Sequence, residues 1–198
     1  MANAWEFPTS IDVDGVQYEI RTDYRVVLDL MTALNDPELL EEDEETRAYI
    51  QGIITLQIMF PDCDNIPEEH IKDALKKVVE FIDMGMESDS KNAPKTMDWE
   101  QDAPILIPAI NKVLNCEIRA QKYIHWWTFL GAYMEIGESL FSSIVNIRQK
   151  LAKPGKKLEK WEQDFYKENK SLIDFKQKNQ RSDGEKNMLR DYFGYGKK

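Results

Sequence analysis

The chain has 198 residues, of which 42% are hydrophobic and 31% are charged, and its formal net charge is −10. This balance predicts one domain with a sizeable core and excludes a collagen-like or wholly disordered chain. Two cysteines, Cys63 and Cys116, exclude a disulfide scaffold or a cysteine-rich zinc module, and neither a signal peptide nor a membrane span is predicted.

The charge is unevenly distributed along the chain. Residues 1–102 carry 25 acidic and 8 basic side chains, whereas residues 103–198 carry 11 acidic and 18 basic ones. Seven of the acids lie within residues 36–45. A bipolar chain can pair head to tail with copies of itself or offer different faces to two partners, and an unevenly charged solvated surface is the simpler interpretation of the same pattern.

The first residues predict a β-hairpin followed by helices. Apolar and polar residues alternate on both sides of Asp14-Gly15, a favoured two-residue turn. Because an isolated hairpin is marginal in water, we expect it to pack on helices. Apolar residues at helical spacing then predict a helix over 24–34 with Thr22 or Asp23 as its cap, a buried helix through 49–58, and a third over 67–82 that Gly85 ends.

A polar stretch, residues 87–97, predicts a linker near the point where the charge changes sign. Asp98 is expected to cap the next segment, 99–114, which Pro104 and Pro108 should kink or divide into two short helices. The apolar segment 123–136 predicts a central, buried helix.

The last helical patterns fall in residues 140–165. Apolar residues over 140–151 predict one helix, and Leu158, Trp161 and Phe165 predict a basic amphipathic helix whose shared apolar face belongs to the core. We therefore predict a mainly α protein of the α+β class, with an N-terminal hairpin packed on a multi-helix bundle. One domain covers 1–175, with an acidic part (1–86), a linker (87–97) and a helical part (98–175), and residues 176–198 form a mobile polar tail.

No residue pattern indicates catalysis, and we expect no enzyme activity, cofactor or metal site. The segment 62–64 with His70 has neither the spacing of a calcium loop nor the second cysteine pair of a zinc site. His125 adjoins Trp126 in an apolar segment, which is typical of a core or boundary histidine. Cys116 could act as a nucleophile only beside a histidine that the sequence does not place there.

Nucleic-acid binding is an alternative that the C-terminal composition raises. Residues 148–198 carry 15 basic and 8 acidic side chains, interleaved with aromatic ones, and such a surface can contact phosphates and stack on bases. The predicted core position of Trp161 and Phe165 and the acidic remainder of the chain argue against it. A chain with a hairpin, helices and dipolar charge fits protein binding better, because tryptophan and tyrosine are enriched at binding hot spots.

Several segments resemble one bacteriophage family. They are HWWTFLGAYMEIG at 125–137, SIVNIR at 143–148, KKLEKWEQDFY at 156–166, DWEQDAP at 98–104 and IPEE at 66–69. The family is the "gene product fifteen" family of siphophages and prophages of Gram-positive bacteria, and the resemblance runs from the hairpin to Phe175. The N-terminal pattern, with Gly15, Tyr18 and Asp23-Tyr24, also looks like that of phage tail assembly chaperones.

This resemblance implies a function that composition and spacing do not. It implies a gene beside the tape-measure gene and a role as tail assembly chaperone, which binds the tape-measure protein, helps recruit tail-tube protein and self-associates. The protein would act in the cytoplasm of the host and be absent from the mature virion. A virion structural protein, of the tail or connector, and a nucleic-acid-binding phage regulator are the alternatives.

The candidate partner-binding residues lie in two regions. The helical region 126–148 is expected to support the shape of the client surface, and the basic region 150–170 is expected to contact a neighbouring copy or the tube subunit. The residues selected are Trp126, Trp127, Phe129, Tyr133, Arg148, Lys156, Lys157 and Lys160.

Overall fold

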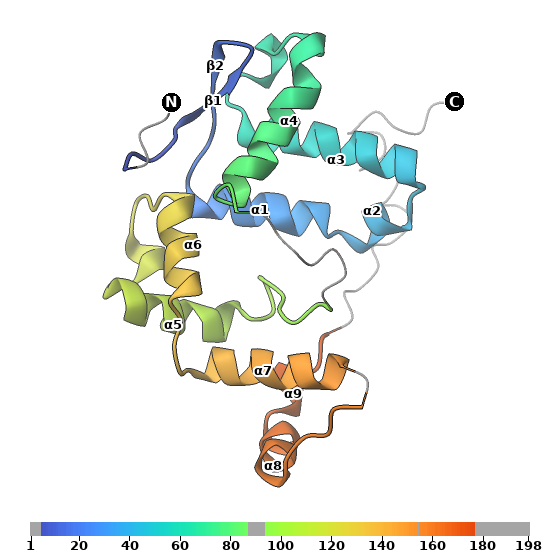
Figure 1. The fold of residues 1–198 in the computed structure, drawn as a ribbon, viewed down its shortest axis with the longest axis vertical. Coiled ribbons are helices and arrows are strands. Elements are labelled where there is room, and N and C mark those ends of the chain that lie inside the picture. Colours follow the sequence, from blue (N-terminus) through green and yellow to red (C-terminus); the bar gives the residue numbers. More distant parts are fainter. Residues whose placement is uncertain (1–4, 87–93, 154, 177–198) are drawn as a thin grey trace.

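The computed structural model describes residues 5–86, 94–153 and 155–176. These residues form three tiers along the longest axis of the molecule (Figure 1). The predicted class is confirmed, because the chain is mainly helical with one small antiparallel hairpin near its N-terminus. Most of the predicted linker, residues 87–93, and the predicted tail beyond Lys176 lie outside the described residues.

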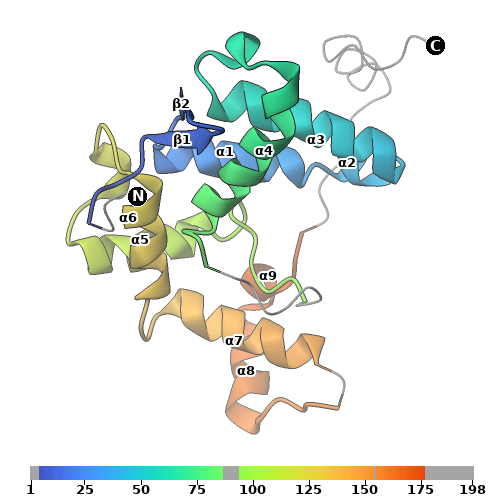
Figure 2. The same cartoon turned by 45° about the horizontal axis from the view of Figure 1, so that its top comes forward.

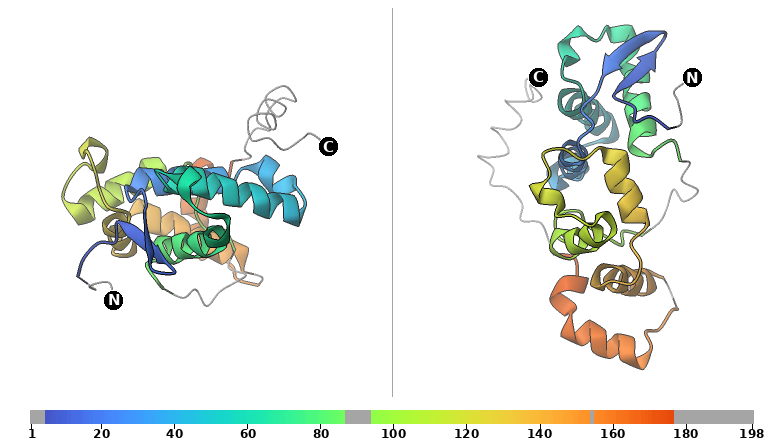
Figure 3. Two further views of the ribbon diagram at one scale, coloured as in Figure 1. Left: turned by 90° about the horizontal axis from the view of Figure 1, so that it is seen from above. Right: turned by 90° about the vertical axis from the view of Figure 1, so that its left-hand side faces the viewer.

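In the described residues, the first tier holds the hairpin and four helices. Two short 3-10 helices, η1 and η2, lie in the segments that connect the longer helices. The elements of the first tier are β1 (Ser10–Val13), β2 (Val16–Glu19), α1 (Tyr24–Leu34), α2 (Pro37–Glu41), α3 (Glu44–Met59), η1 (Cys63–Asn65) and α4 (Glu68–Ile82). The middle tier holds α5 (Ala103–Leu114), η2 (Ile118–Ala120) and α6 (Trp126–Met134), and the last tier holds α7 (Leu140–Ala152), α8 (Lys160–Glu168) and α9 (Lys170–Ile173). The side view in Figure 3 separates the tiers most clearly. None of the described helices is both long and apolar enough to cross a membrane.

The hairpin forms as predicted and packs on a helix. Asp14 and Gly15 both have positive φ angles, 52° and 83°, as a tight hairpin turn requires, and the Asp12 carboxylate accepts a hydrogen bond from the Gly15 amide at 3.1 Å. Ile11 and Val13 are buried, and β1 packs against α4.

Helices α1 and α4 begin and end close to their predicted bounds, whereas α3 begins at Glu44, before the predicted segment 49–58. Tyr49, expected in the buried helix, is exposed. Asp23 caps α1 by accepting a hydrogen bond from the Arg25 amide, and Asp43 caps α3 by accepting one from Thr46. Gly85, with a φ angle of 70°, follows α4, and its amide donates to the Glu80 carbonyl at 2.8 Å. Met84, with a φ angle of 53°, takes the left-handed position after the helix that glycine usually occupies, and its amide donates to the Phe81 carbonyl at 3.2 Å.

Helix α5 is one helix through Pro108 rather than two short helices, and it begins at Ala103 rather than after Asp98. Pro104 lies in the first turn, where a backbone N–H has no partner within the helix. Pro108 removes the hydrogen bond that would reach the carbonyl of residue 104, and its ring crowds that carbonyl. Burial of Leu106 and Ile110 on the same helix offsets that loss. Asp98 instead caps the preceding turn, accepting hydrogen bonds from the amides of Glu100 and Gln101.

Helix α6 corrects a second prediction, because it begins at Trp126 rather than at residue 123. Residues 22–24 and 124–126 pair as a short antiparallel bridge: the Tyr24 amide donates to the Ile124 carbonyl at 3.0 Å, and the Trp126 amide donates to the Thr22 carbonyl at 2.7 Å. This pairing holds the start of the apolar segment extended. It also joins the first tier to the middle tier, where α1 packs on α6 (Figure 2).

The core has a large part and a small part. The main cluster extends from the hairpin to Phe141 in α7, whereas Ile144, Ile147 and Ile173 form a separate small cluster between α7 and α9. Leu158 and Phe165 pack against the small cluster as predicted, but Trp161 is 61% exposed, which corrects its predicted place in the core. Since successive turns of α8 bring residues 162 and 165 toward α7 and α9, residue 161 faces outward.

Candidate functional site

The two adjacent tryptophans join α6 to the end of α4. The Trp126 indole donates to the Ile82 carbonyl, and the Trp127 indole donates to the Phe81 carbonyl, each at 2.8 Å. The last carbonyls of a helix lack partners within the helix. The Trp126 indole gives the Ile82 carbonyl a partner from another tier, and the Trp127 indole gives the Phe81 carbonyl a second donor beside the Met84 amide, which lies 3.2 Å from it. Trp126 is fully buried and Trp127 is half-buried.

Phe129 and Tyr133 continue the aromatic packing along α6. Phe129 is buried and stacks on Tyr24 with ring centroids 4.6 Å apart. The Tyr133 hydroxyl donates to the Met97 sulfur at 3.1 Å, and burial raises the pKa of this phenol above its ordinary value. Phe129 therefore lies in the interior, and Tyr133 lies half-buried beside it.

His125 caps α6 and fastens the N-terminal residues to it. Its Nδ1 accepts a hydrogen bond from the Trp127 amide at 3.1 Å, so Nε2 carries the proton and donates to the Pro8 carbonyl at 3.0 Å. The Phe7 ring stacks on the imidazole at 4.5 Å. Burial lowers the pKa of His125 below its ordinary value, because a charged imidazolium would lose solvation and its accepting nitrogen.

Arg148 is buried and uses all five of its N–H donors. It forms a bidentate ion pair with the Asp102 carboxylate, at 2.6 and 2.9 Å. Its other donors reach the carbonyls of Thr96, Leu172 and Ile173 at 2.7–3.2 Å. The Phe175 ring lies 4.3 Å from the guanidinium carbon, and we call Arg148, Asp102 and Phe175 the Arg148 cluster.

The Arg148 cluster connects four segments of the chain. It holds the residues before α5, the start of α5, the middle of α7 and the end of α9 in one place. Asp102 was not selected from the sequence, because its partner lies 46 residues away and no local spacing indicates the pair. The cluster positions elements rather than offering Arg148 to a partner, since the exposed fraction of its side chain is 3%.

The three selected lysines, unlike Arg148, are exposed. Lys156, Lys157 and Lys160 lie in the connection from α7 to α8 and at the start of α8. Trp161, which was assigned to the core from the sequence, is exposed beside them. Sequence periodicity could not place Trp161 correctly, because α8 buries Glu162 instead. The buried Glu162 carboxylate accepts hydrogen bonds from the Lys150 ammonium and from the Glu159 amide.

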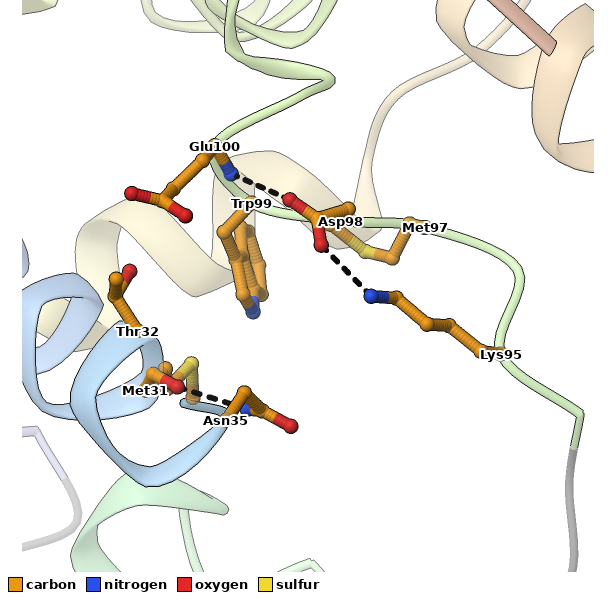
Figure 4. A pocket seen from close by; sticks show the side chains of 8 residues that line it. All are labelled: Met31, Thr32, Asn35, Lys95, Met97, Asp98, Trp99 and Glu100. Atoms are coloured by element: carbon orange, nitrogen blue, oxygen red, sulfur yellow. Dashed lines mark hydrogen bonds and ion pairs between the residues drawn. The ribbon is translucent and has the colours of Figure 1, made fainter. Parts of the chain in front are cut away.

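A small cavity lies where α1 meets the segment before α5. Its volume is about 280 Å³, and Met31, Asn35, Lys95, Met97, Asp98 and Trp99 are among its lining residues. Figure 4 shows the Trp99 indole pointing toward Met31 and Asn35, with the Lys95 ammonium 2.7 Å from Asp98. Thioether, indole and carboxylate groups together suit an apolar or cationic side chain.

The residues considered for catalysis or metal binding lie apart. His70 makes a 2.7 Å hydrogen bond with the Tyr18 hydroxyl, which fastens β2 to α4. Cys63 and Cys116 are free and half-buried. Within the described ranges, no three histidine, cysteine or acidic side chains converge as metal ligands would.

Comparison with known proteins places these features in a family. The family described as bacteriophage Gp15 protein matches residues 5–175. The chain belongs to the bacteriophage Gp15 family. The matched range of this Gp15 protein begins before the hairpin and includes all three tiers, so the indole caps of α4 and the Arg148 cluster both lie within it.

The identification rests on the family comparison alone. No curated protein and no solved structure matches the chain. The match confirms the resemblance drawn from segments 66–69, 98–104, 125–137, 143–148 and 156–166, and the molecule is a bacteriophage protein.

Proposed function

We propose that this Gp15 protein is a tail assembly chaperone. It binds the tape-measure protein, keeps that protein's long apolar helices soluble, and helps recruit tail-tube subunits while copies of the chaperone associate along the client. It acts in the cytoplasm of the bacterial host and leaves before the virion is complete. The proposal assigns no catalytic step and no cofactor to the chain.

The main structural support is an exposed tryptophan among lysines on the last tier. Trp161 is 61% exposed, while the tier that carries it is fixed by the buried Arg148–Asp102 pair. A large aromatic side chain presented to solvent on an ordered helix is a common anchor for protein contacts. A chaperone with many weak contacts needs such anchors more than it needs one enclosed pocket.

Co-expression with the tape-measure protein of the same phage tests the proposal. We expect the tape-measure protein to become soluble and to co-purify with many copies of this chain in a pull-down followed by sedimentation. A tape-measure protein that stays insoluble and unbound would leave only the family assignment standing.

Mass spectrometry of purified particles distinguishes the proposal from a virion structural role. The chaperone should be missing from tails and connectors, whereas a structural component would be present at a fixed copy number. Because Trp161 and its lysines also suit a nucleic-acid groove, a gel shift at low salt with mixed DNA and RNA tests that second role. A salt-dependent shift would favour it.

A further inference from the structure

The last tier carries a surface that combines exposed apolar and basic side chains. Leu151 at the end of α7 is 51% exposed and Trp161 on α8 is 61% exposed. The exposed lysines of the α7–α8 connection accompany them. We call this set the α7–α8 surface: Leu151, Lys153, Lys156, Lys157, Lys160 and Trp161.

The α7–α8 surface is presented by an ordered framework. The Trp161 indole donates to the Glu159 carboxylate at 2.8 Å, which restrains the ring on the outside of α8. Lys150, Lys167 and Lys170 of the same tier pair with Glu162, Asp164 and Asp174. Among the ion pairs within residues 94–153 and 155–176, none uses the lysines of the α7–α8 surface.

The end of α2 and the first half of α3 carry exposed acidic and apolar side chains. Glu44 and Glu45, in the first turn of α3, are exposed. Tyr49, one turn after Glu45, is 65% exposed, and Leu40 on α2 is 50% exposed. We call Leu40, Glu44, Glu45 and Tyr49 the α2–α3 face.

These two surfaces lie in different tiers of one molecule. In Figures 1 and 2, α2 and α3 lie in the first tier, and α8 lies at the far end of the last tier. Contact between them therefore requires two copies. The two surfaces are opposite in charge, since the α2–α3 face carries Glu44 and Glu45 whereas the α7–α8 surface carries four lysines. Each surface also offers aromatic and aliphatic groups to the other.

We propose that the α7–α8 surface docks on the α2–α3 face of a second copy of this chain. Trp161 is the apolar anchor, packing with Leu40 and Tyr49, and the lysines pair with Glu44 and Glu45. This contact is heterologous, so it repeats from copy to copy and produces a row or a ring. The inference rests on the proposed function for the idea that copies line up along a client.

A charge-exchange experiment tests this docking on the full-length protein. One variant carries Lys156→Glu, Lys157→Glu and Lys160→Glu, and the other carries Glu44→Lys and Glu45→Lys. Sedimentation equilibrium at low salt should show association of the wild type, and association at least about tenfold weaker for each variant alone. A mixture of the two variants should associate again, because each then meets a surface of opposite charge.

Matched variants separate this contact from a general effect of charge or of misfolding. Lys76→Glu, Lys112→Glu and Lys122→Glu together change the net charge equally at exposed lysines elsewhere, and they should leave association unchanged. Trp161→Ala should weaken association about tenfold without altering the net charge. Lysines in place of Glu44 and Glu45 would interact unfavourably with the dipole of α3 and could destabilise the helix itself. A Glu44→Gln and Glu45→Gln variant removes the two negative charges without adding positive ones, and it should also weaken association.

A wild-type protein that is monomeric at low salt and high concentration would contradict the docking. The docking would also be contradicted if substitution of the control lysines weakened association as much as substitution of Lys156, Lys157 and Lys160, or if the mixture of the two charge variants stayed monomeric. Each of these outcomes is measured without the client. Failure of the docking is therefore distinct from failure of the chaperone role, which is read from the solubility of the tape-measure protein.

Discussion

At the scale of single residues, the buried ion pair between Arg148 and Asp102 does the most to hold distant segments together. Removing two charges from water is costly, and their attraction offsets that cost only when the remaining donors and acceptors are satisfied. Here the guanidinium donates five hydrogen bonds, and Asp102 accepts a further one from the Asp98 amide at 2.9 Å. The pair therefore depends on all four segments being in place.

Breaking this pair should destabilise the fold strongly. Arg148→Ala leaves the Asp102 carboxylate buried without its partner, and we expect the free energy of unfolding to fall by about 3–5 kcal/mol. Arg148→Lys should rescue little of the loss, because an ammonium lacks the planar fork that reaches both carboxylate oxygens. Urea unfolding followed by circular dichroism measures both.

The exposed pair of Arg119 and Glu117 provides the control for this change. It has similar bidentate geometry, at 2.8 and 2.9 Å, but it lies at the surface. Arg119→Ala should leave the unfolding midpoint almost unchanged, since solvent screens an exposed pair. Equal effects of Arg148→Ala and Arg119→Ala on the unfolding midpoint would show that burial of the Arg148 ion pair adds nothing to stability.

His125 makes the stability depend on pH in a defined direction. Its pKa is lower in the folded protein than the value of about 6.5 in an unfolded chain, so between these values only the unfolded state binds the proton. The stabilisation that His125 contributes to the folded state is fully present above the pKa of the unfolded chain. This stabilisation decreases as the pH falls from that value toward the pKa of the folded protein. We expect the free energy of unfolding to be lower at pH 5.5 than at pH 7.5.

A His125→Asn variant separates this effect from other titrations. Asparagine caps helices well and does not titrate, so the difference in stability between the two pH values should shrink. An unchanged difference would assign the pH dependence to other groups.

At the scale of elements, helix ends depend on residues from other parts of the chain. The carboxyl end of α4 is completed by two indoles of α6. The end of α3 is completed by Arg21, whose guanidinium donates to the carbonyls of Gln57, Ile58 and Phe60 at 2.8–3.1 Å. The tiers are therefore joined by polar contacts at helix ends as well as by apolar packing.

Trp127→Phe tests the contribution of one indole cap. Phenylalanine keeps most of the ring but removes the donor to the Phe81 carbonyl, and we expect a loss of about 1 kcal/mol in the free energy of unfolding. Hydrogen exchange should also accelerate in the last turn of α4. Trp161→Phe, at an exposed position, is the matched control and should change stability by less than about 0.5 kcal/mol. Equal losses in the two variants would argue against the cap.

Local patterns predicted those elements that local forces determine. The Asp14-Gly15 turn, a cap of α1 at Thr22 or Asp23 and an end of α4 before Gly85 all depend on residues within a few positions of each other, and all three were predicted. The start of α6 was missed because pairing of residues 124–126 with 22–24 decides it. The continuity of α5 was missed because burial of Leu106 and Ile110 outweighs the proline penalty.

The candidate site could be predicted only in part. Lys156, Lys157 and Lys160 were correctly expected at the surface, since charge alone indicates exposure. Trp161 was misplaced, because the direction in which a short helix turns its large side chain depends on the elements that it packs against. The partner of Arg148 could not be predicted either, because Asp102 is brought to it by the packing of elements that are distant in the sequence.

At the scale of the whole molecule, the two clusters of the core differ in size. The main cluster reaches across the first and middle tiers, whereas three fully buried isoleucines make up the second: Ile144, Ile147 and Ile173. A tier with little buried apolar area should open more readily than the rest.

Native-state hydrogen exchange can detect this difference. Amides of α7, α8 and α9 should exchange at a lower opening free energy than those of α1 and α6, and Arg148→Lys should widen the gap because the Arg148 cluster fastens the last tier. Uniform protection across the three tiers would indicate a single cooperative unit instead.

The pairing of residues 22–24 with 124–126 has a consequence for synthesis of the chain. A ribosome makes the acidic segment first, yet the capping carboxylate of Asp23 and the last carbonyls of α4 receive partners from residues 124–127. The first tier therefore stays incomplete until the middle tier has left the ribosome. The charge of the chain changes sign near residue 102, but the chain does not fold as two separate units on either side of that point. A fragment that ended there would lack the residues that complete the caps of α1 and α4.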